Sequence, residues 1–449
     1  MVVFFGIFNY AIFIMCVGDE MMNSNISGFY KLSIEDRLKV IKEQTELSDE
    51  DIDLLSKTGA LSPELADRMI ENVIGTMPMT LGIATNFQIN GHDYLVPMAI
   101  EEPSVVAAAS NSAKAVRAGG GFKAETTDPI MIGQIQLTHV EDAEMAKDQI
   151  LTAKGELLAK CNTFDPMLVK LGGGARDIEA RVIQTEQGPM VIIHVLVNCL
   201  DAMGANAVNT MAEGISPDIE GLTGGRVYLR IISNLAIHRL AKVKAVFPKD
   251  AIGGEDVVDG IVEAYAFAAA DPFRCATHNK GIMNGIDAVV IATGNDFRAI
   301  EAGAHSYAAY KEGGYKPLTK YWKDENGDLV GTIETPMAVG LIGGATAVHP
   351  TAKACVKLLG VKSASELAQV IAAVGLAQNF GALRALATEG IQRGHMSLHA
   401  RNLTVMAAEQ LGVEATPELI DKVVGILVEE KQTRMDRAIE VIKELQGSG

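Results

Sequence analysis

Two short polar segments of this chain carry residue types that could do chemistry on a carbonyl group. Residues 277–281 (THNKG) place Lys280 beside asparagine and glycine, and residues 293–296 (TGND) end in Asp296. The run between them, 288–292 (AVVIA), is apolar and β-branched, which predicts a buried strand. We therefore expect Lys280 and Asp296 to meet. An aspartate would hold the ammonium charged and oriented, and such a cation stabilises a developing oxyanion.

The sequence pattern alone also allows simpler interpretations of these acidic and basic residues. Lys280 could be an exposed loop lysine, and Asp296 could cap the helix that begins at residue 297. Glu101 and Glu102 follow a short apolar run, 98–100. Strand alternation would send one to each face, so one could be buried with a raised pKa, or both could be solvated acids at a strand end.

Six segments stand in one order that resembles 3-hydroxy-3-methylglutaryl-CoA (HMG-CoA) reductases of class II, the soluble bacterial and archaeal type. They are ENVIG (71–75), EEPS (101–104), DAMGAN (201–206), THNKGIMNGID (277–287), TGND (293–296) and GHMSLHARN (394–402). The resemblance runs from about residue 33 to the C-terminus. It implies an oxidoreductase that interconverts HMG-CoA and mevalonate plus CoA by two hydride transfers. It implies NAD(H), with NADP(H) as the alternative, and no metal.

The resemblance also implies roles for individual residues. The implied catalytic residues are Glu102, Lys280, Asp296 and His395. Lys280 would stabilise the oxyanion, Glu102 would protonate the aldehyde oxygen, and Asp296 would bridge the two. His395, on a C-terminal flap, would protonate the departing CoA thiolate, which suits a group that titrates near neutrality. The implied substrate contacts are Arg274, which would pair with the free carboxylate of HMG, Ser104 and Asn284.

The segment 201–206 (DAMGAN) lies where a predicted strand ends and a helix begins. Free backbone N–H groups there could hold a pyrophosphate, although an ordinary β-to-α turn has the same pattern. No GxGxxG fingerprint occurs in the chain. The resemblance implies cofactor contacts for Asp201, Met203, Gly204, Ala205 and Asn206.

Asp165 lies near the family position that is linked to the choice of NAD over NADP. A carboxylate can accept hydrogen bonds from a ribose 2′-hydroxyl and repels a 2′-phosphate. The surrounding residues, 159–168 (AKCNTFDPML), depart from the family pattern by two extra residues, and a plain Asp-Pro turn is the alternative.

His395 and His399 are four residues apart, so they share a face if this segment is helical. Such a pair could bind a metal, but the chain shows no HExxH glutamate or third ligand here. Core or surface histidines are the simpler interpretation, and we expect no metal site.

Composition limits the class of protein. With 449 residues and 48% hydrophobic content, the chain can bury large cores and should form two or three domains. A net charge of −17 argues against a nucleic-acid surface. Five widely spaced cysteines form no CxxC pair, so we expect neither disulfides nor a thiolate metal site, in keeping with a reducing cytoplasm.

Periodicity predicts a mixed α+β and α/β multidomain fold. Residues 128–231 alternate strands and helices, and we interpret them as a small non-Rossmann nicotinamide-binding domain inserted into a large CoA-binding domain, 33–127 and 232–388. Glycine at residue 390 predicts a hinge, and residues 389–449 form the helical C-terminal flap. The family builds its site across a dimer interface, so the resemblance implies a homodimer or an assembly of dimers.

Residues 1–32 form an N-terminal extension of unclear status. Its first 17 residues are almost wholly apolar, slightly short for a membrane span and without a basic flank. A signal or anchor, a start codon placed too early, and a packing arm are the three interpretations; we expect no membrane association. Two rival functions stay open: another NAD-linked acyl-CoA or aldehyde oxidoreductase on the same scaffold, and a non-catalytic ligand-binding assembly protein.

Overall fold

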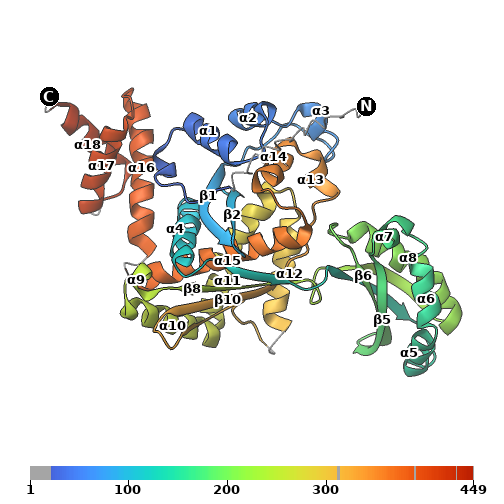
Figure 1. The fold of residues 1–449 in the computed structure, drawn as a ribbon. Coiled ribbons are helices and arrows are strands. Elements are labelled where there is room, and N and C mark those ends of the chain that lie inside the picture. The colour runs from blue at the N-terminus through green and yellow to red at the C-terminus, as the bar shows by residue number, and fades with distance from the viewer. Residues whose placement is uncertain (1–21, 311–313, 389–390, 431, 448–449) are drawn as a thin grey trace, which may run out of the picture.

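The structure is a computed structural model that describes residues 22–310, 314–388, 391–430 and 432–447. It does not describe the side chains of residues 345 and 391–399. The apolar run 1–17 and the expected hinge at 389–390 therefore lie outside the described residues. Figure 1 shows a large body of helices and strands, a smaller lobe formed by the middle of the chain, and a group of helices at the C-terminus.

The N-terminal part is helical, as its sequence predicts. After the 3-10 turn η1 (Phe29–Lys31) come α1 (Ile34–Gln44), α2 (Asp49–Ser56) and α3 (Pro63–Ala66). Ser33 caps α1 by accepting from the N–H of Asp36, and Ser48 forms a full capping box with Asp51. Residues of η1, α1 and α2 pack in a small apolar cluster with residues of β2 (His92–Ala99) and α14 (Pro350–Leu359).

Asn90-Gly91, between two runs of strand-like sequence, predicts a tight hairpin, and the structure has one there. Strands β1 (Leu81–Ile89) and β2 (His92–Ala99) pair antiparallel, and both turn residues have positive φ, 51° at Asn90 and 86° at Gly91. That geometry belongs to the type I′ turn, which asparagine followed by glycine favours. Strand β2 ends just before Glu102, and α4 (Val105–Ala118) follows.

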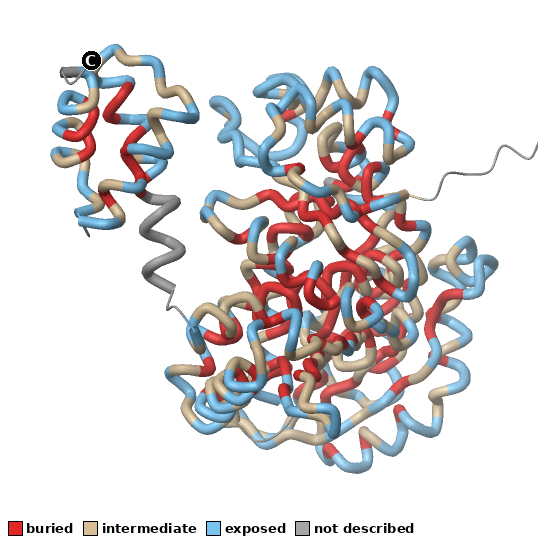
Figure 2. Tube along the Cα trace, turned by 60° about the vertical axis from the view of Figure 1, so that its left-hand side comes forward, coloured by how far each residue is buried: buried red, intermediate tan, exposed pale blue. Residues whose placement is uncertain are grey.

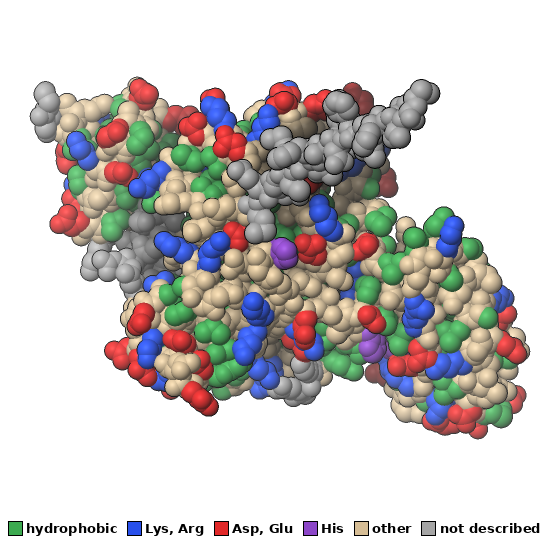
Figure 3. All heavy atoms as spheres, viewed as in Figure 1, with side chains coloured by type: hydrophobic (Ala, Val, Ile, Leu, Met, Phe, Trp, Pro, Cys, Tyr) green, Lys and Arg blue, Asp and Glu red, His purple; other side chains and the backbone are tan. Residues whose placement is uncertain are grey.

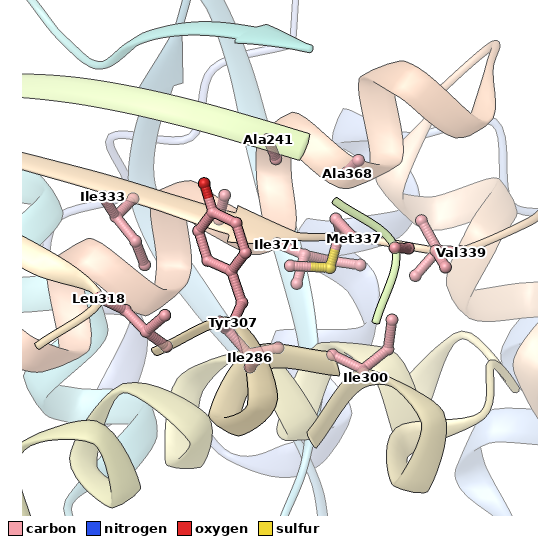
Figure 4. Packing of buried hydrophobic residues seen from close by; sticks show 14 of the residues in the cluster. Ala241, Ile286, Ile300, Tyr307, Leu318, Ile333, Met337, Val339, Ala368 and Ile371 are labelled. Atoms are coloured by element: carbon pink, nitrogen blue, oxygen red, sulfur yellow. The ribbon is translucent and has the colours of Figure 1, made fainter. Parts of the chain in front are cut away.

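The core of the large body is α15 (Ala364–Ala387), a helix of 24 residues that is buried along most of its length. It packs on α4, α10 (Glu255–Ala270), α11 (Pro272–Ala292) and a four-stranded sheet. The sheet order is β3 (Lys123–Thr126), β8 (Leu240–Phe247), β10 (Leu329–Pro336) and β9 (Thr319–Lys323), all antiparallel. Figure 4 shows side chains from α11, α12, β8, β10 and α15 meeting in this core.

Helix α15 is long and apolar enough to span a membrane, but 67% of its most apolar window is buried inside the protein. Ser363, followed three residues later by Glu366, is the sequence pattern of a helix cap, and it caps α15 by accepting from the N–H of Glu366. The burial identifies α15 as a core helix.

A second antiparallel sheet forms the smaller lobe. Its order is β5 (Gly174–Thr185), β6 (Gly188–Asn198), β4 (Ile130–Thr138) and β7 (Arg226–Ser233). Helices α5 (Ala143–Thr152), α6 (Lys154–Cys161) and α8 (Ala205–Thr223) pack on it, and α7 (Pro166–Lys170) precedes β5. A Rossmann sheet is mostly parallel, so the expected mixed, non-Rossmann fold class is confirmed.

The remaining elements complete the body and the C-terminal group. They are α9 (Lys249–Ile252), α12 (Phe297–Tyr310), α13 (Gly344–Val348), α14 (Pro350–Leu359), α16 (Ile391–Leu411), α17 (Pro417–Glu429) and α18 (Met435–Gly447). Helices α16 to α18 bury their own apolar cluster, and Figure 2 shows them standing beside the main body.

One predicted element is wrong. Residues 288–292 are the last turn and a half of α11, not a strand, and residues 277–281 lie in the same helix. Eleven residues of α11 are buried, from Cys275 to Ala292. A helix covered on several sides shows no clear 3.6-residue period, so its short apolar runs resemble a buried strand.

Candidate active site

Three of the expected site residues meet on one face of α11. Lys280 and Asn284 are one turn apart, and both contact Glu102, which follows β2. The ammonium Nζ of Lys280 lies 2.9 Å from Oε2 of Glu102, and Nδ2 of Asn284 donates to the same oxygen at 3.2 Å. The Glu102 side chain is 32% exposed and that of Lys280 is 59% exposed, so a ligand can reach the pair.

The neighbours of Lys280 in the sequence hold α11 in place. Nδ2 of Asn279 donates to the carbonyl of Lys316 at 3.0 Å, and its Oδ1 accepts from the N–H of Leu318 at 3.1 Å. Nε2 of His278 lies 2.7 Å from Oγ1 of Thr319. Burial lowers the pKa of His278 to about 3, so this imidazole is neutral and structural. Within the segment 277–281, His278 and Asn279 are therefore buried and hold the helix in place, and the side chain of Lys280 is exposed.

Ser104, two residues after Glu102, has a strained backbone. Its φ of 75° and ψ of −18° lie in the left-handed region, and it stands at the N-cap of α4 without capping it. Its Oγ is buried and has no hydrogen-bond partner among the described residues. A non-glycine residue in this conformation, with an unsatisfied hydroxyl beside a carboxylate, is typical of functional sites.

Asp296 lies elsewhere within a single chain. Its Oδ1 accepts from the N–H groups of Arg298 and Ala299 and pairs with the Arg298 guanidinium at 3.3 Å, so it caps α12. Lys280 stands twelve residues before the end of α11, which is about 18 Å of helix. In the described part of the chain, Asp296 has no hydrogen bond or ion pair with Lys280 or Glu102.

Arg274 opens α11, where its N–H donates to the capping Oδ1 of Asp271 at 2.7 Å. Its guanidinium has no hydrogen bond or ion pair with any described residue, and partial burial lowers its pKa. The chain does not bring this guanidinium to Glu102. The Arg274 guanidinium therefore has no counter-ion among the described residues.

The segment 201–206 forms the predicted junction of strand and helix. Gly204 is the N-cap of α8 with φ 106°, and no side chain caps the helix. A Cβ at Gly204 would stand 2.3 Å from the Sγ of Cys199, so glycine is required. The first N–H groups of α8 are thus left for a ligand, which fits a pyrophosphate. Asp201 does not face them: its Oδ1 accepts from the N–H of Ala364 at 2.7 Å.

Sequence reasoning missed Arg239, which fixes the segment 201–206 to the large body. This side chain is 5% exposed and donates to the carbonyls of Ala202, Met203 and Val339, at 3.0, 3.1 and 2.6 Å. Burial lowers its pKa. The segment around residue 340 also forms a parallel bridge between Ala202 and Ile342. No motif in the sequence marked Arg239.

Sequence reasoning also missed Asp287, one turn beyond Asn284 on α11. Burial and the neighbouring carboxylate of Glu301, on α12, raise the pKa of Asp287 to about 8. Its Oδ1 is buried without a partner among the described residues. Two carboxyl groups that share a buried site cannot both ionise near neutrality.

Asp165 makes none of the contacts of this group. Asp165 caps α7, its Oδ1 accepting from the N–H of Leu168 at 2.9 Å. His395 and His399 lie in α16, and their side chains are outside the description. Among the described residues, no three His, Cys, Asp or Glu side chains are grouped to hold a metal. Cys275 is buried, and burial raises its pKa to about 11, so its thiol is inert.

Comparison with known proteins gives consistent matches. The family model of hydroxymethylglutaryl-coenzyme A reductase matches residues 33–400. The chain is 64% identical to the 3-hydroxy-3-methylglutaryl-coenzyme A reductase of Archaeoglobus fulgidus, with 95% of each chain covered. It is 34% identical to a probable reductase of Borreliella burgdorferi, over 84% of this chain and 88% of that one. The class II reductase of Streptococcus pneumoniae, solved with NADPH in open conformations, matches with TM-score 0.78 and 42% identity, over 81% of this chain and 99% of that one.

Proposed function

Since this chain belongs to the hydroxymethylglutaryl-coenzyme A reductase family, which interconverts HMG-CoA with mevalonate and CoA, we propose that Glu102, Lys280 and Asn284 form the reacting part of its site. The observation that carries this assignment is their contact: two nitrogen donors converge on one oxygen of Glu102. When bound, the nicotinamide supplies the hydride. The chain supplies the groups that handle the charge and protons.

Each reduction step leaves a negative oxygen on the substrate. The ammonium of Lys280, held at the surface of a rigid helix, stabilises that oxygen. Glu102 donates a proton to the aldehyde oxygen in the second reduction, and Asn284 fixes its orientation. His395 protonates the CoA thiolate when the carbon–sulfur bond breaks.

Two further residues suit the substrate. The unpaired guanidinium of Arg274 pairs with the free carboxylate of HMG, and partial burial strengthens that pairing because water screens it less. The unpartnered hydroxyl of Ser104 donates to the same substrate beside Glu102. Both groups lack partners within the described residues, which a bound ligand would supply.

The site is completed by a second copy of the chain. Asp296 is too far along α11 to reach the Lys280 of its own chain, so a second copy supplies it. The segment between α3 and β1 supports a homodimer, because its large apolar side chains are exposed: Met69, Ile70, Ile74, Met77 and Met79. A contiguous exposed apolar segment marks an interface.

Cofactor choice and domain roles follow from the same proposal. Residues 128–231 bind the nicotinamide cofactor, 33–127 and 232–388 bind HMG-CoA, and 389–449 close over the site. The carboxylate of Asp165, at the N-cap of α7, favours NADH because it repels a 2′-phosphate. The four described cysteines are free and buried, which fits the cytoplasm.

The experiment is an HMG-CoA-dependent oxidation of reduced nicotinamide, run separately with NADH and NADPH. Lys280→Met should lower kcat by about 10²-fold or more and leave cofactor binding unchanged, because only the oxyanion loses its cation. Lys39→Met, an exposed lysine on α1, is the matched control and should keep full activity. Full activity in Lys280→Met would refute the assignment. Turnover of other thioesters and none of HMG-CoA would favour the rival acyl-CoA oxidoreductase.

A further inference from the structure

A lysine-lined pocket lies on the outer face of the sheet β3-β8-β10-β9. Along β8, Ala241, Val243 and Ala245 are buried toward α15, and the alternate residues face outward. The cavity has a volume of about 470 Å³, and five lysines line it: Lys123, Lys242, Lys244, Lys316 and Lys320. Lysine and arginine side chains gather in the lower centre of the face in Figure 3, where β10 and α12 lie in Figure 1.

Three of these lysines stand in one row across the sheet. Lys123 on β3 is directly opposite Lys244 on β8, Lys244 is opposite Thr332 on β10, and Thr332 is opposite Lys320 on β9. Directly paired residues of neighbouring strands point to the same face. The row therefore presents three ammonium groups and one hydroxyl to the same pocket.

The three row lysines have no counter-ion. The adjacent row carries two acids and one lysine, Glu125, Lys242 and Glu334, and Nζ of Lys242 pairs with Oε2 of Glu334 at 3.3 Å. Lys316 donates to the carbonyl of Ala269 at 3.1 Å. Across the part of the chain that the structure describes, by contrast, Lys123, Lys244 and Lys320 make no ion pair or side-chain hydrogen bond.

Such a row is unfavourable without a ligand. Like charges directly opposite on neighbouring strands destabilise a sheet, as Lys123 and Lys244 do here, and Lys320 adds a third like charge two strands from Lys244. The chain as a whole carries a net charge of −17, so it has many acidic residues that could have paired with these lysines. An anion that bridges the row would convert this repulsion into attraction.

We propose that this pocket binds a small organic phosphate, with at least two phosphate charges, at a site separate from the Glu102–Lys280 pair. The row spans about three strand intervals, or ~14 Å, which is too long for one carboxylate and suits a diphosphate or two phosphate groups. Lysine ammonium groups bind phosphate as point charges. Tyr307, Ala308 and Pro317 also line the cavity and would contact the organic part. The cavity volume lies in the range of small-molecule sites.

We assign the pocket to a free organic phosphate; the phosphate end of coenzyme A shares this chemistry, and the test separates the two sources. The test uses inorganic diphosphate as the probe, titrated into the full chain by calorimetry. The pocket variant combines Lys123→Gln, Lys244→Gln and Lys320→Gln. The control variant combines Lys39→Gln, Lys42→Gln and Lys57→Gln, which removes the same charge from the N-terminal helices. Melting curves with and without diphosphate check that each variant folds.

The expected result is saturable binding in the wild type and in the control, and binding weaker by roughly tenfold or more in the pocket variant. Diphosphate should raise the melting temperature of the wild type and control only. HMG-CoA turnover without diphosphate should be the same in all three. Equal binding in all three would overturn the proposal, because the lysines would then act only through net charge.

Two other outcomes would overturn it in distinguishable ways. If CoA displaces diphosphate and the pocket variant has a raised KM for HMG-CoA, the pocket is part of the substrate site. If the pocket variant changes its oligomeric state and does not bind diphosphate less well, the row faces an acidic surface of a second copy. Neither outcome depends on the roles of Glu102 and Lys280, which the Lys280→Met experiment tests.

Discussion

Ser104 holds a left-handed backbone conformation that costs an ordinary residue about 1–2 kcal/mol. Ser104→Gly should relieve that strain, and Ser104→Ala should not, although both remove the hydroxyl. We expect the glycine variant to melt at a higher temperature than the alanine variant, by the equivalent of about 1 kcal/mol. Both should show the same lowered kcat/KM for HMG-CoA. If the alanine variant keeps wild-type kcat/KM, the hydroxyl does not contact the substrate.

Asp287 should make stability depend on pH in the neutral range. Its pKa in the folded protein is raised to about 8, from about 4 in an unfolded chain, so the folded state holds an extra proton between these values. The stability contributed by this proton is fully present below about pH 4 and is lost as the pH rises from about 4 to about 8. Asp287→Asn cannot ionise and should remove the loss.

The measurement is the melting temperature from about pH 5 to pH 9. Asp287→Asn should lie closest to the wild type at the acidic end and exceed it by a margin that grows up to about pH 8, to the equivalent of about 1 kcal/mol or more. Asp250→Asn, an exposed acid on α9, is the control and should follow the wild type throughout. A constant difference between Asp287→Asn and wild type at every pH would contradict the shared-proton interpretation.

Single residues could be predicted from the sequence only where a motif names them. The motifs EEPS and THNKGIMNGID indicated Glu102, Lys280 and Asn284, and these three side chains are in contact in the structure. A single sequence shows no comparable motif that would single out Arg239 or Asp287. Their importance depends on burial and on neighbours distant in the chain, such as Val339 and Glu301, which local spacing cannot reveal.

At the scale of elements, α11 shows why the local interpretation was wrong and why Lys280 and Asn284 still contact Glu102. The run 288–292 is short, apolar and β-branched, and only the length of the whole helix separates it from a strand. Lys280 and Asn284 face Glu102 because a helix places residues four apart on one side. Elements with a clear terminus or turn signal were predicted well, including the Asn90 hairpin and the Ser363 cap of α15.

Asn279 connects α11 to the chain before β9, and its removal should destabilise the whole body. Asn279→Ala leaves the carbonyl of Lys316 and the N–H of Leu318 without partners in a buried place. We expect a loss of about 2–4 kcal/mol, seen as a lower melting temperature. Asn326→Ala, in the turn before β10, should change stability by less than about 0.5 kcal/mol. Equal melting temperatures for these two variants would show that α11 is held mainly by its apolar contacts.

At the scale of the whole molecule, the separation of Asp296 from Lys280 decides where the reaction takes place. One chain contains a Glu102–Lys280 pair and, at the far end of α11, an aspartate that caps α12. If a second copy supplies Asp296, each dimer has two sites, and each site needs Lys280 from one chain and Asp296 from the other. Variants at these two positions are then each inactive alone.

Mixing the two variants should restore activity. When Lys280→Met and Asp296→Asn chains are co-expressed in equal amounts, about half of the dimers are mixed. In each mixed dimer one site carries both substitutions and the other carries neither, so turnover should recover to about a quarter of the wild-type value. The matched control pairs Lys280→Met with Glu102→Gln. Glu102 and Lys280 touch within one chain, so no mixed dimer has an intact site and activity should stay absent. Recovery in the control pair, or none in the test pair, would mean that Asp296 is not shared between chains in this way.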